Sequence, residues 1–158
     1  MADPPRRVAV TGAAGYVGSG LVKRLEADDQ VEGILATDIR PPPEGYGQKV
    51  SYLQQDITSP IGDSLVDRQI DTVVHLAYVM RPGRDREAVR RTNVGGTESI
   101  LKACADAGVG RVVYLSSTSA YGAHPDNPTF LIEESPLRPV KGFQYAEDKA
   151  AAEALVQE

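Results

Sequence analysis

A glycine-rich turn between an apolar run and an amphipathic segment constrains this chain more than any other feature. Residues 7–11 are typical of a short buried strand, and residues 15–27 repeat apolar side chains at helical spacing. The turn between them can bend sharply, approach a pyrophosphate and pack closely on a helix. This order of strand, turn and helix predicts a dinucleotide site and disfavours a plain tight turn. The residues expected to contact the cofactor here are Gly12, Ala14, Gly15, Tyr16, Val17 and Gly18.

Strands and helices alternate along the rest of the chain. Further strands are expected over 31–38, 50–55, 71–77 and 111–115, and further helices over 61–68, 85–107 and 143–158. Prolines make 41–45 and 116–142 irregular, and Gly108 ends the long helix. The alternation predicts an α/β fold, a Rossmann-like doubly wound parallel sheet in the order 3-2-1-4-5, with one domain over 1–158. The expected inner helix faces are Val17, Leu21 and Leu25, then Val94, Thr97, Leu101 and Cys104.

Carboxylates follow two of these strands. Asp38 lies about 20 positions after Gly18, where it can bond both ribose hydroxyls and repel a 2′-phosphate, which favours NAD over NADP. Ile39 is expected to contact the cofactor as well, and Arg40 would either stack on the adenine or weaken that preference. Asp56 and Ile57 follow the third strand and are expected at the adenine amine and ring face. A solvated turn residue is the alternative role for Asp38.

Hydroxyl, phenol and ammonium groups are expected near the carboxyl end of the fifth strand. Ser116-Ser117-Thr118 closes that strand, and Tyr145 and Lys149 share one face of the last helix at i, i+4 spacing. A tyrosine and a lysine at this spacing often occur by chance. The position of this pair after the fifth strand is therefore what indicates a site. The predicted crevice thus contains groups suited to proton transfer.

Six short segments occur along the chain in the order that is found in one known protein family. The chain resembles the extended short-chain dehydrogenases/reductases, which include nucleotide-sugar epimerases and dehydratases, over nearly its whole length. The segments are Thr11–Gly18, Asp56-Ile57, His75-Leu76-Ala77, Asn93-Val94-Gly95-Gly96-Thr97, Ser116-Ser117 with Tyr121-Gly122, and Tyr145 with Lys149.

This resemblance implies a role for each matched residue. Tyr145 would be the acid/base for a substrate hydroxyl or carbonyl, Lys149 would lower its pKa and bond the nicotinamide ribose, and Ser117 would bond the reacting oxygen, with Thr118 as the alternative. A phenol ordinarily titrates near 10, and a neighbouring ammonium brings its pKa toward neutrality. The resemblance also implies that Leu76, Ala77, Tyr78 and Asn93 border the cofactor, with His75 as a strand residue.

Composition excludes several other classes of protein. A net charge of −5 without a basic stripe disfavours nucleic acid as a partner, and the group Arg81, Arg84, Arg86, Arg90 and Arg91 is expected to be a solvated helix start and loop. The single Cys104 excludes an internal disulfide and is expected in the core, and no Cys/His spacing predicts a metal site. The absence of a leader-like or membrane-length apolar stretch leads us to expect a cytoplasmic protein with no membrane association.

The resemblance also implies chain beyond residue 158. Relatives continue with at least one more strand and a smaller lobe that grips the substrate, so we expect truncation and keep a naturally short relative as the alternative. A homodimer through the helices 85–107 and 143–158 is expected. The substrate would bear a hydroxyl or carbonyl, with a nucleotide sugar as one candidate. The remaining alternatives are a reductase of steroid-like alcohols, a cofactor-sensing binding protein and an interaction module.

Overall fold

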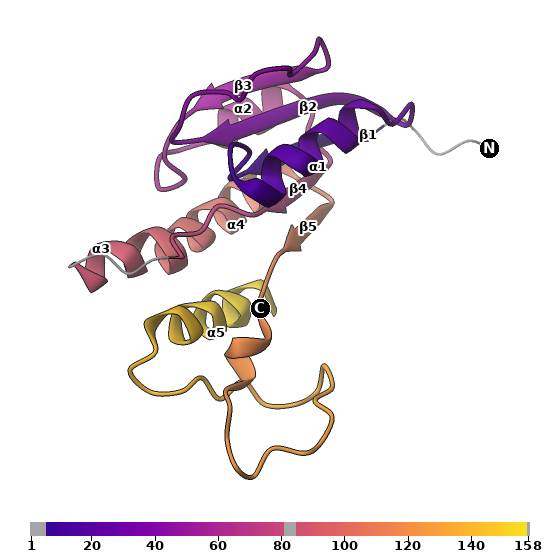
Figure 1. Ribbon diagram of the computed structural model, residues 1–158. Helices are drawn as coiled ribbons and strands as arrows, with labels where there is room; N and C mark the ends of the chain where they lie inside the picture. Colours follow the sequence, from indigo (N-terminus) through magenta and orange to yellow (C-terminus); the bar gives the residue numbers. More distant parts are fainter. Residues whose placement is uncertain (1–5, 81–84, 158) are drawn as a thin grey trace. The chain divides into compact units, whose positions relative to one another are not determined.

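The computed structural model describes residues 6–80 and 85–157 of the chain (Figure 1). These residues form two compact units. The first contains residues up to Tyr78 together with Ser99–Leu115, and the second contains Val79–Glu98 together with residues from Ser116 onward. Arg81 and Arg84 of the predicted arginine group, and Glu158 of the predicted last helix, lie outside the described residues.

All five strands of the first unit join one parallel sheet. They are β1 (Arg6–Thr11), β2 (Val31–Asp38), β3 (Val50–Gln54), β4 (Thr72–His75) and β5 (Arg111–Tyr114). Their order is β3-β2-β1-β4-β5, which confirms the Rossmann-like fold and the predicted strand order. β4 ends at His75, earlier than predicted, because the Leu76 and Ala77 amides turn to the Thr11 hydroxyl, each at 3.1 Å.

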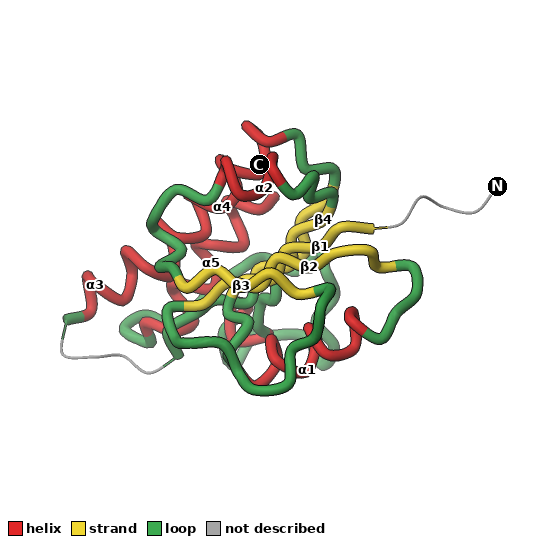
Figure 2. Tube along the Cα trace, turned by 90° about the horizontal axis from the view of Figure 1, so that it is seen from above, coloured by secondary structure: helices red, strands yellow, loops and turns green. Residues whose placement is uncertain are grey.

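Helices cover both faces of this sheet (Figure 2). The helix α1 (Tyr16–Glu26) lies on one face, and α2 (Gly62–Asp67) lies on the other with the part of α4 (Gly96–Ala107) that belongs to this unit. Neighbouring side chains on a strand point to opposite faces. Thus Val8 and Val10 pack on the α1 side, whereas Ala9 packs on the α2 side.

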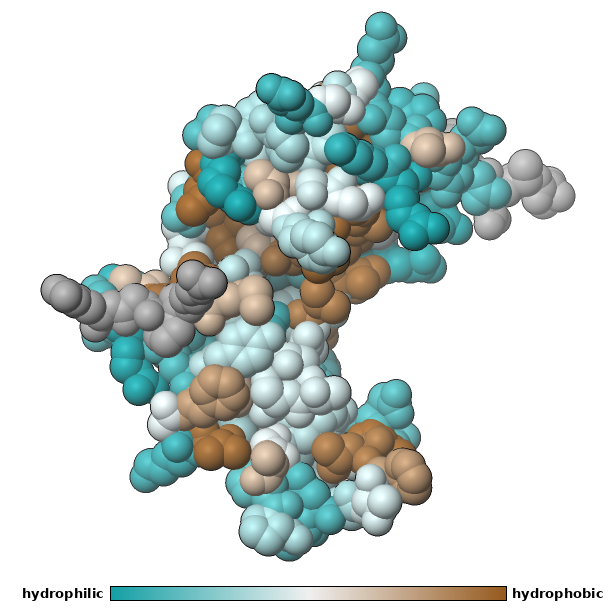
Figure 3. Space-filling view, viewed as in Figure 1, coloured by the Kyte–Doolittle hydropathy of each residue, from teal (hydrophilic) through white to brown (hydrophobic). Residues whose placement is uncertain are grey.

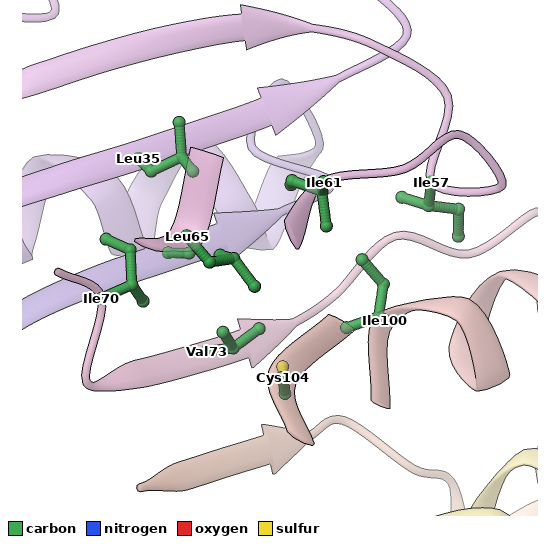
Figure 4. Packing of buried hydrophobic residues seen from close by; sticks show 9 residues of the cluster. Leu35, Ile57, Ile61, Leu65, Ile70, Val73, Ile100 and Cys104 are labelled. Carbon is green, nitrogen blue, oxygen red and sulfur yellow. The ribbon is translucent and has the colours of Figure 1, made fainter. Parts of the chain in front are cut away.

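The core on the α2 side is built from tightly buried aliphatic side chains (Figure 4). Leu35 from β2, Val73 from β4 and Ile100 from α4 are at most 1% exposed. Cys104 packs against them, and burial raises the pKa of its thiol to about 11. The burial of Cys104 confirms its predicted core role. A thiol with this pKa stays protonated at neutral pH, which does not suit a nucleophile.

Two residues of the predicted inner helix faces, Val17 and Leu101, are not buried, whereas Thr97 and Cys104 are buried as predicted and Leu21 and Leu25 pack, partly buried, against the core. Val17 is 52% exposed, whereas Gly18 and Val22 are buried in α1. Gly18 faces the glycine turn, so Val17, about 100° further around the helix, points away. Likewise Ile100, and not Leu101, is buried in α4.

The second unit is built mainly from short helical segments. They are α3 (Arg86–Arg90), the π-helical turn η1 (Arg91–Gly95), the start of α4, the 3₁₀ turn η2 (Thr118–Tyr121) and α5 (Gln144–Gln157). The single helix predicted over 85–107 is therefore interrupted by η1. A π turn shifts the hydrogen-bond register by one residue and is frequent at functional sites.

The segment between η2 and α5 has no helix or strand, as its prolines predicted. Figure 3 shows brown, hydrophobic side chains on the loop that Figure 1 draws in orange, where Phe130, Leu131 and Ile132 are exposed. In residues 6–80 and 85–157, none of the helices is both long and apolar enough to cross a bilayer.

We expect Leu35→Ala to lower the free energy of unfolding by about 2–5 kcal/mol, because it leaves a cavity in a core that cannot collapse fully. Urea denaturation followed by circular dichroism measures the change. Val66→Ala is the matched control: Val66 is 57% exposed on α2, and its replacement should change the free energy by no more than about 0.5 kcal/mol. Equal losses in the two variants would contradict this view of the core.

Candidate functional site

The glycine turn is held in the first unit by close backbone packing. Gly12 has a φ of 69°, in the left-handed region that favours glycine. A Cβ atom on Gly12 would lie 2.7 Å from the backbone nitrogen of Ala77, closer than real Cβ atoms come. The turn is therefore closed against the chain that leaves β4, and a side chain at position 12 is excluded twice.

Gly18 allows α1 to pack on the turn. A Cβ atom on Gly18 would overlap the carbonyl oxygen of Gly12, and one on Gly15 would lie 3.0 Å from the same oxygen. The predicted role of Gly18 was close packing of helix on sheet. The structure refines this role, because the surface that Gly18 meets is the turn itself.

The start of α1 fits an anionic ligand. No side chain caps this 11-residue helix at Gly15, and its first turn contains no acidic residue. Tyr16 is 98% exposed there. Uncapped amides at a positive helix end bind phosphate groups well. The turn and helix start therefore fit an anionic group such as a pyrophosphate, and its binding by the predicted residues stays a prediction.

Two contacts at the turn were not foreseen. The Ala14 amide, predicted to contact the cofactor, donates to the Asp38 carboxylate at 3.0 Å. The Tyr46 hydroxyl donates to the Ala13 carbonyl at 2.7 Å. Tyr46 follows the proline-rich loop, where no periodic pattern signals a contact with the turn. Both bonds fix the turn from the side of β2 and its following loop.

Asp38 is buried at the end of β2 and pairs with Arg40. The Arg40 Nε and Nη2 atoms lie 3.1 and 3.2 Å from its two carboxylate oxygens, and the Arg40 amide donates at 3.0 Å. Ile39 between them is 65% exposed. Of the two roles considered for Arg40, neither includes this contact. The guanidinium occupies the oxygens that a ribose would need, so a ribose would compete with it.

The pKa of Asp38 is lower than its usual value. Burial raises the pKa, but hydrogen bonds from the Arg40 side chain and from the Arg40 and Ala14 amides lower it by more in total. A lowered folded-state pKa means that the ionised carboxylate stabilises the fold above the unfolded pKa, near 4, and loses this effect as the pH falls through the folded value. Asp38 is thus an anion at neutral pH.

Asp56 and Ile57, which were expected at the adenine, have contacts within the protein. Ile57 is 6% exposed and belongs to the hydrophobic core, although it was expected at the adenine ring. One oxygen of Asp56 accepts bonds from the Thr58 amide and hydroxyl, both at 2.8 Å. Contact of Asp56 and Ile57 with a cofactor therefore stays a prediction. The Ile57 side chain packs in the hydrophobic core.

Thr11 links the glycine turn to the end of β4. Its buried hydroxyl accepts from the Leu76 and Ala77 amides and lies 2.7 Å from Nδ1 of His75. With both lone pairs used, the hydroxyl proton points to Nδ1. His75 lies stacked on Tyr114, with ring centroids 5.8 Å apart. Its predicted strand role is consistent with this position, and Tyr78 nearby is half-buried.

In the second unit, α5 presents Tyr145 and Lys149 one turn apart. Tyr145 is half-buried, and Lys149 is 5% exposed. Burial lowers the pKa of Lys149 to about 8, against an opposing effect of the Glu153 carboxylate. Ser117 caps η2, where its hydroxyl lies 2.8 Å from that of Ser119, and Thr118 is exposed. The predicted hydroxyl, phenol and ammonium all belong to this unit, whereas the glycine turn belongs to the first unit.

Asp148, for which no sequence motif predicts a role, is a buried residue that fixes α5 to neighbouring segments. It is 1% exposed and lies 2.9 Å from the Arg90 guanidinium. The Asn93 side-chain amide lies 3.4 Å from it, accepts from the Val79 amide at 2.8 Å and donates to the Val79 carbonyl at 3.2 Å. This joins α5 to α3 and η1. Neither Arg90 nor Asp148 belongs to a recognised motif, so no sequence signal identified the pair.

A hollow of about 450 Å³ adjoins Tyr145. Its lining is largely apolar and includes Met80, Phe143 and Tyr145, with Arg86 as a cation. The Phe143 and Tyr145 rings lie 5.9 Å apart. The size lies within the range of small-molecule pockets, which is about 300–1,000 Å³.

Gly18→Ala should destabilise the fold by at least about 2 kcal/mol, because the added methyl group overlaps the Gly12 carbonyl and must displace backbone. Gly20→Ala is the matched control on α1: nothing lies within 4 Å of its added Cβ, so it should stabilise by up to about 1 kcal/mol. Thermal unfolding measures both. A tolerated Gly18→Ala would show that the turn is looser than described.

Arg90→Met should cost about 1–3 kcal/mol of unfolding free energy, because it leaves the buried Asp148 carboxylate without its cation. The control is Arg91→Met, one residue on: Arg91 lies 3.8 Å from Glu87, and both side chains are exposed. A surface pair of this kind is worth about 0–1 kcal/mol. Denaturant titration compares the two, and equal effects would argue against a special role of the Arg90–Asp148 pair.

Known proteins resemble this chain over almost its whole length. A 3β-hydroxysteroid dehydrogenase/Δ5→4-isomerase from vaccinia virus (strain Ankara) is 34% identical over 157 residues, which cover 94% of this chain and 44% of the viral protein. The chain thus spans about half the length of the curated relatives that it matches.

Solved structures agree with this relationship. The dTDP-glucose 4,6-dehydratase DesIV from Streptomyces venezuelae, with NAD and TYD bound, matches with a TM-score of 0.82 at 28% identity, over 96% of this chain and 50% of that one. MoeE5 in complex with UDP-glucose and NAD matches with a TM-score of 0.76 at 36% identity, over 94% and 47%. Residues 8–158 match the family described as "NAD dependent epimerase/dehydratase family". The chain belongs to this family of NAD-dependent epimerases and dehydratases, as the order of its sequence motifs indicated.

Proposed function

We propose that this chain supplies the NAD site and the proton-transfer groups of an enzyme that acts on a hydroxyl- or carbonyl-bearing small molecule. The observation that carries the proposal is the pairing on α5 of the half-buried Tyr145 with the buried Lys149 one turn later. A sensing protein has no need of a buried ammonium such as that of Lys149 one turn from a phenol, because burying a cation costs free energy. Both compact units would then belong to one NAD-binding domain.

The residues of the first unit would hold the dinucleotide. The turn Gly12–Gly18 and the start of α1 would receive the pyrophosphate, and Asp38 would receive the adenosine ribose in place of the Arg40 side chain. Leu76, Ala77 and Tyr78, together with Asn93 of the second unit, would border the nicotinamide end. When bound, NAD accepts a hydride from a substrate carbon or returns one to it.

Proton transfer would fall to the second unit. Tyr145 would take a proton from the substrate hydroxyl or return one to a carbonyl oxygen. Lys149 would stabilise the phenolate by its charge, which requires it to be protonated, and its pKa of about 8 keeps most of it charged at neutral pH. Ser117, or Thr118 as the alternative, would bond the reacting oxygen and hold it in place.

A nucleotide sugar is the first substrate class to test. It is supported by relatives whose solved structures contain UDP-glucose or TYD. A steroid-like alcohol is the second, favoured by the viral hydroxysteroid dehydrogenase and by the largely apolar hollow beside Tyr145. Homodimer formation and a cytoplasmic location stay predictions.

Tyr145→Phe should lower turnover at least about 100-fold and leave NAD affinity within about two-fold, because it removes only the transferable proton. The measurement is NADH absorbance with a panel of nucleotide sugars and hydroxysteroids, together with exchange of label into recovered substrate. Lys149→Met should act in the same direction, whereas Lys141→Met, at an exposed position, is the control. NAD binding with identical behaviour of wild type and Tyr145→Phe would favour a sensing protein instead.

Asp38→Asn should reduce the preference for NAD over NADP about ten-fold, because it removes the charge that repels a 2′-phosphate. Dissociation constants for both cofactors, measured by calorimetry at fixed salt, give the ratio. Glu44→Gln, in the exposed loop after β2, removes an equal charge away from the turn and should leave the ratio unchanged. An unchanged ratio in Asp38→Asn would refute ribose binding by this carboxylate.

A further inference from the structure

A second carboxylate lies one turn beyond Lys149 on α5. Glu153 is half-buried, at i, i+4 from Lys149, and therefore lies on the same helix face. The Ser116 hydroxyl, which follows β5 in the chain, donates a hydrogen bond to its Oε2 atom. A serine hydroxyl thus fixes the position of this carboxylate beside a buried ammonium.

The neutral partner of Glu153 distinguishes it from Asp148. Asp148 is paired with the Arg90 guanidinium at 2.9 Å, so its charge is largely offset. The Ser116 hydroxyl that holds Glu153 carries no charge. It therefore does not offset the charge of the Glu153 carboxylate, which remains available to Lys149. Besides Glu153, Asp148 and Lys149, the titratable groups on α5 and on the elements packed against it (α3, η1 and η2) are Tyr145, Glu147, Tyr121, Arg86, Glu87, Arg90 and Arg91. Because Glu147, Asp148 and Glu87 each lie near an arginine, Glu153 is the carboxylate set to support a cation at position 149.

We propose that Glu153, oriented by Ser116, is a positioning residue that keeps the buried Lys149 protonated. This inference rests on the proposed function for its purpose, since only a charged Lys149 can stabilise a phenolate. The physical reason is a balance of two effects. Burial disfavours the charged ammonium, and a nearby carboxylate favours it. The direction of both effects at Lys149 agrees with this balance.

The Lys149 titration tests the proposal without substrate or cofactor. The protein is labelled with ¹³C-lysine, the Lys149 signal is identified by its loss in Lys149→Met, and its chemical shift is followed from pH 6 to 11. Glu153→Gln keeps the shape and an oxygen for the Ser116 hydroxyl and removes the charge. We expect the pKa of Lys149 to fall from about 8 to roughly 7 in this variant.

Two further variants separate charge from structure. Ser116→Ala keeps the carboxylate but removes its hydrogen bond, and we expect a smaller decrease in the pKa of Lys149. Glu147→Gln removes a charge from the same helix, where Glu147 lies 3.5 Å from Arg86, and should leave the Lys149 titration unchanged. Glu153→Asp, which restores a carboxylate, should recover part of the wild-type value. Melting temperatures show whether each variant is folded.

The outcomes distinguish this inference from the proposed function. A Glu153→Gln protein that folds and titrates like wild type at Lys149 overturns the inference, whether or not the protein is an enzyme. An equal decrease in Glu147→Gln also overturns it, because the effect would then come from the general charge of α5. Conversely, a decrease confined to Glu153→Gln in a protein that fails to bind NAD supports the inference and refutes only the proposed function.

Discussion

The closure of the glycine turn is the constraint on which the first unit depends. Gly12 can approach the backbone of Ala77 because it has no Cβ atom, and Gly18 lets α1 approach Gly12 for the same reason. Thr11 completes the closure by accepting two amides from the chain after β4. These contacts tie three elements together at one edge of the sheet. The uncapped start of α1 is consequently fixed where a phosphate would meet it.

Buried charge is handled by the same device in both units. Asp38 and Asp148 are each at most 6% exposed, and each meets an arginine whose side chain is more than half exposed. A buried carboxylate is tolerated when a guanidinium and further donors surround it. At Asp38 the arrangement occupies a predicted ligand position. At Asp148 it anchors the helix that presents Tyr145.

Most of the fold and part of the site could be predicted from local patterns. Strand order and the position of the glycine turn follow from apolar periodicity and from glycine spacing, which act over a few residues. The Tyr145–Lys149 face follows from helical geometry. Ile57 shows the limit, because a residue next to a carboxylate can equally be a core residue, and burial depends on distant segments. The Arg90–Asp148 pair joins positions 58 residues apart, which no local pattern encodes.

The amino-acid sequence by itself determined the family, the parallel sheet, the glycine turn and the identity of the reactive groups, because these depend on side-chain type and short spacing. Only the tertiary structure decided the partners of those groups. It put Arg40 on Asp38, the Thr11 hydroxyl on His75, and Ser116 on Glu153. Such contacts depend on rotamers and on chain segments brought together by folding, so short sequence spacings do not encode them.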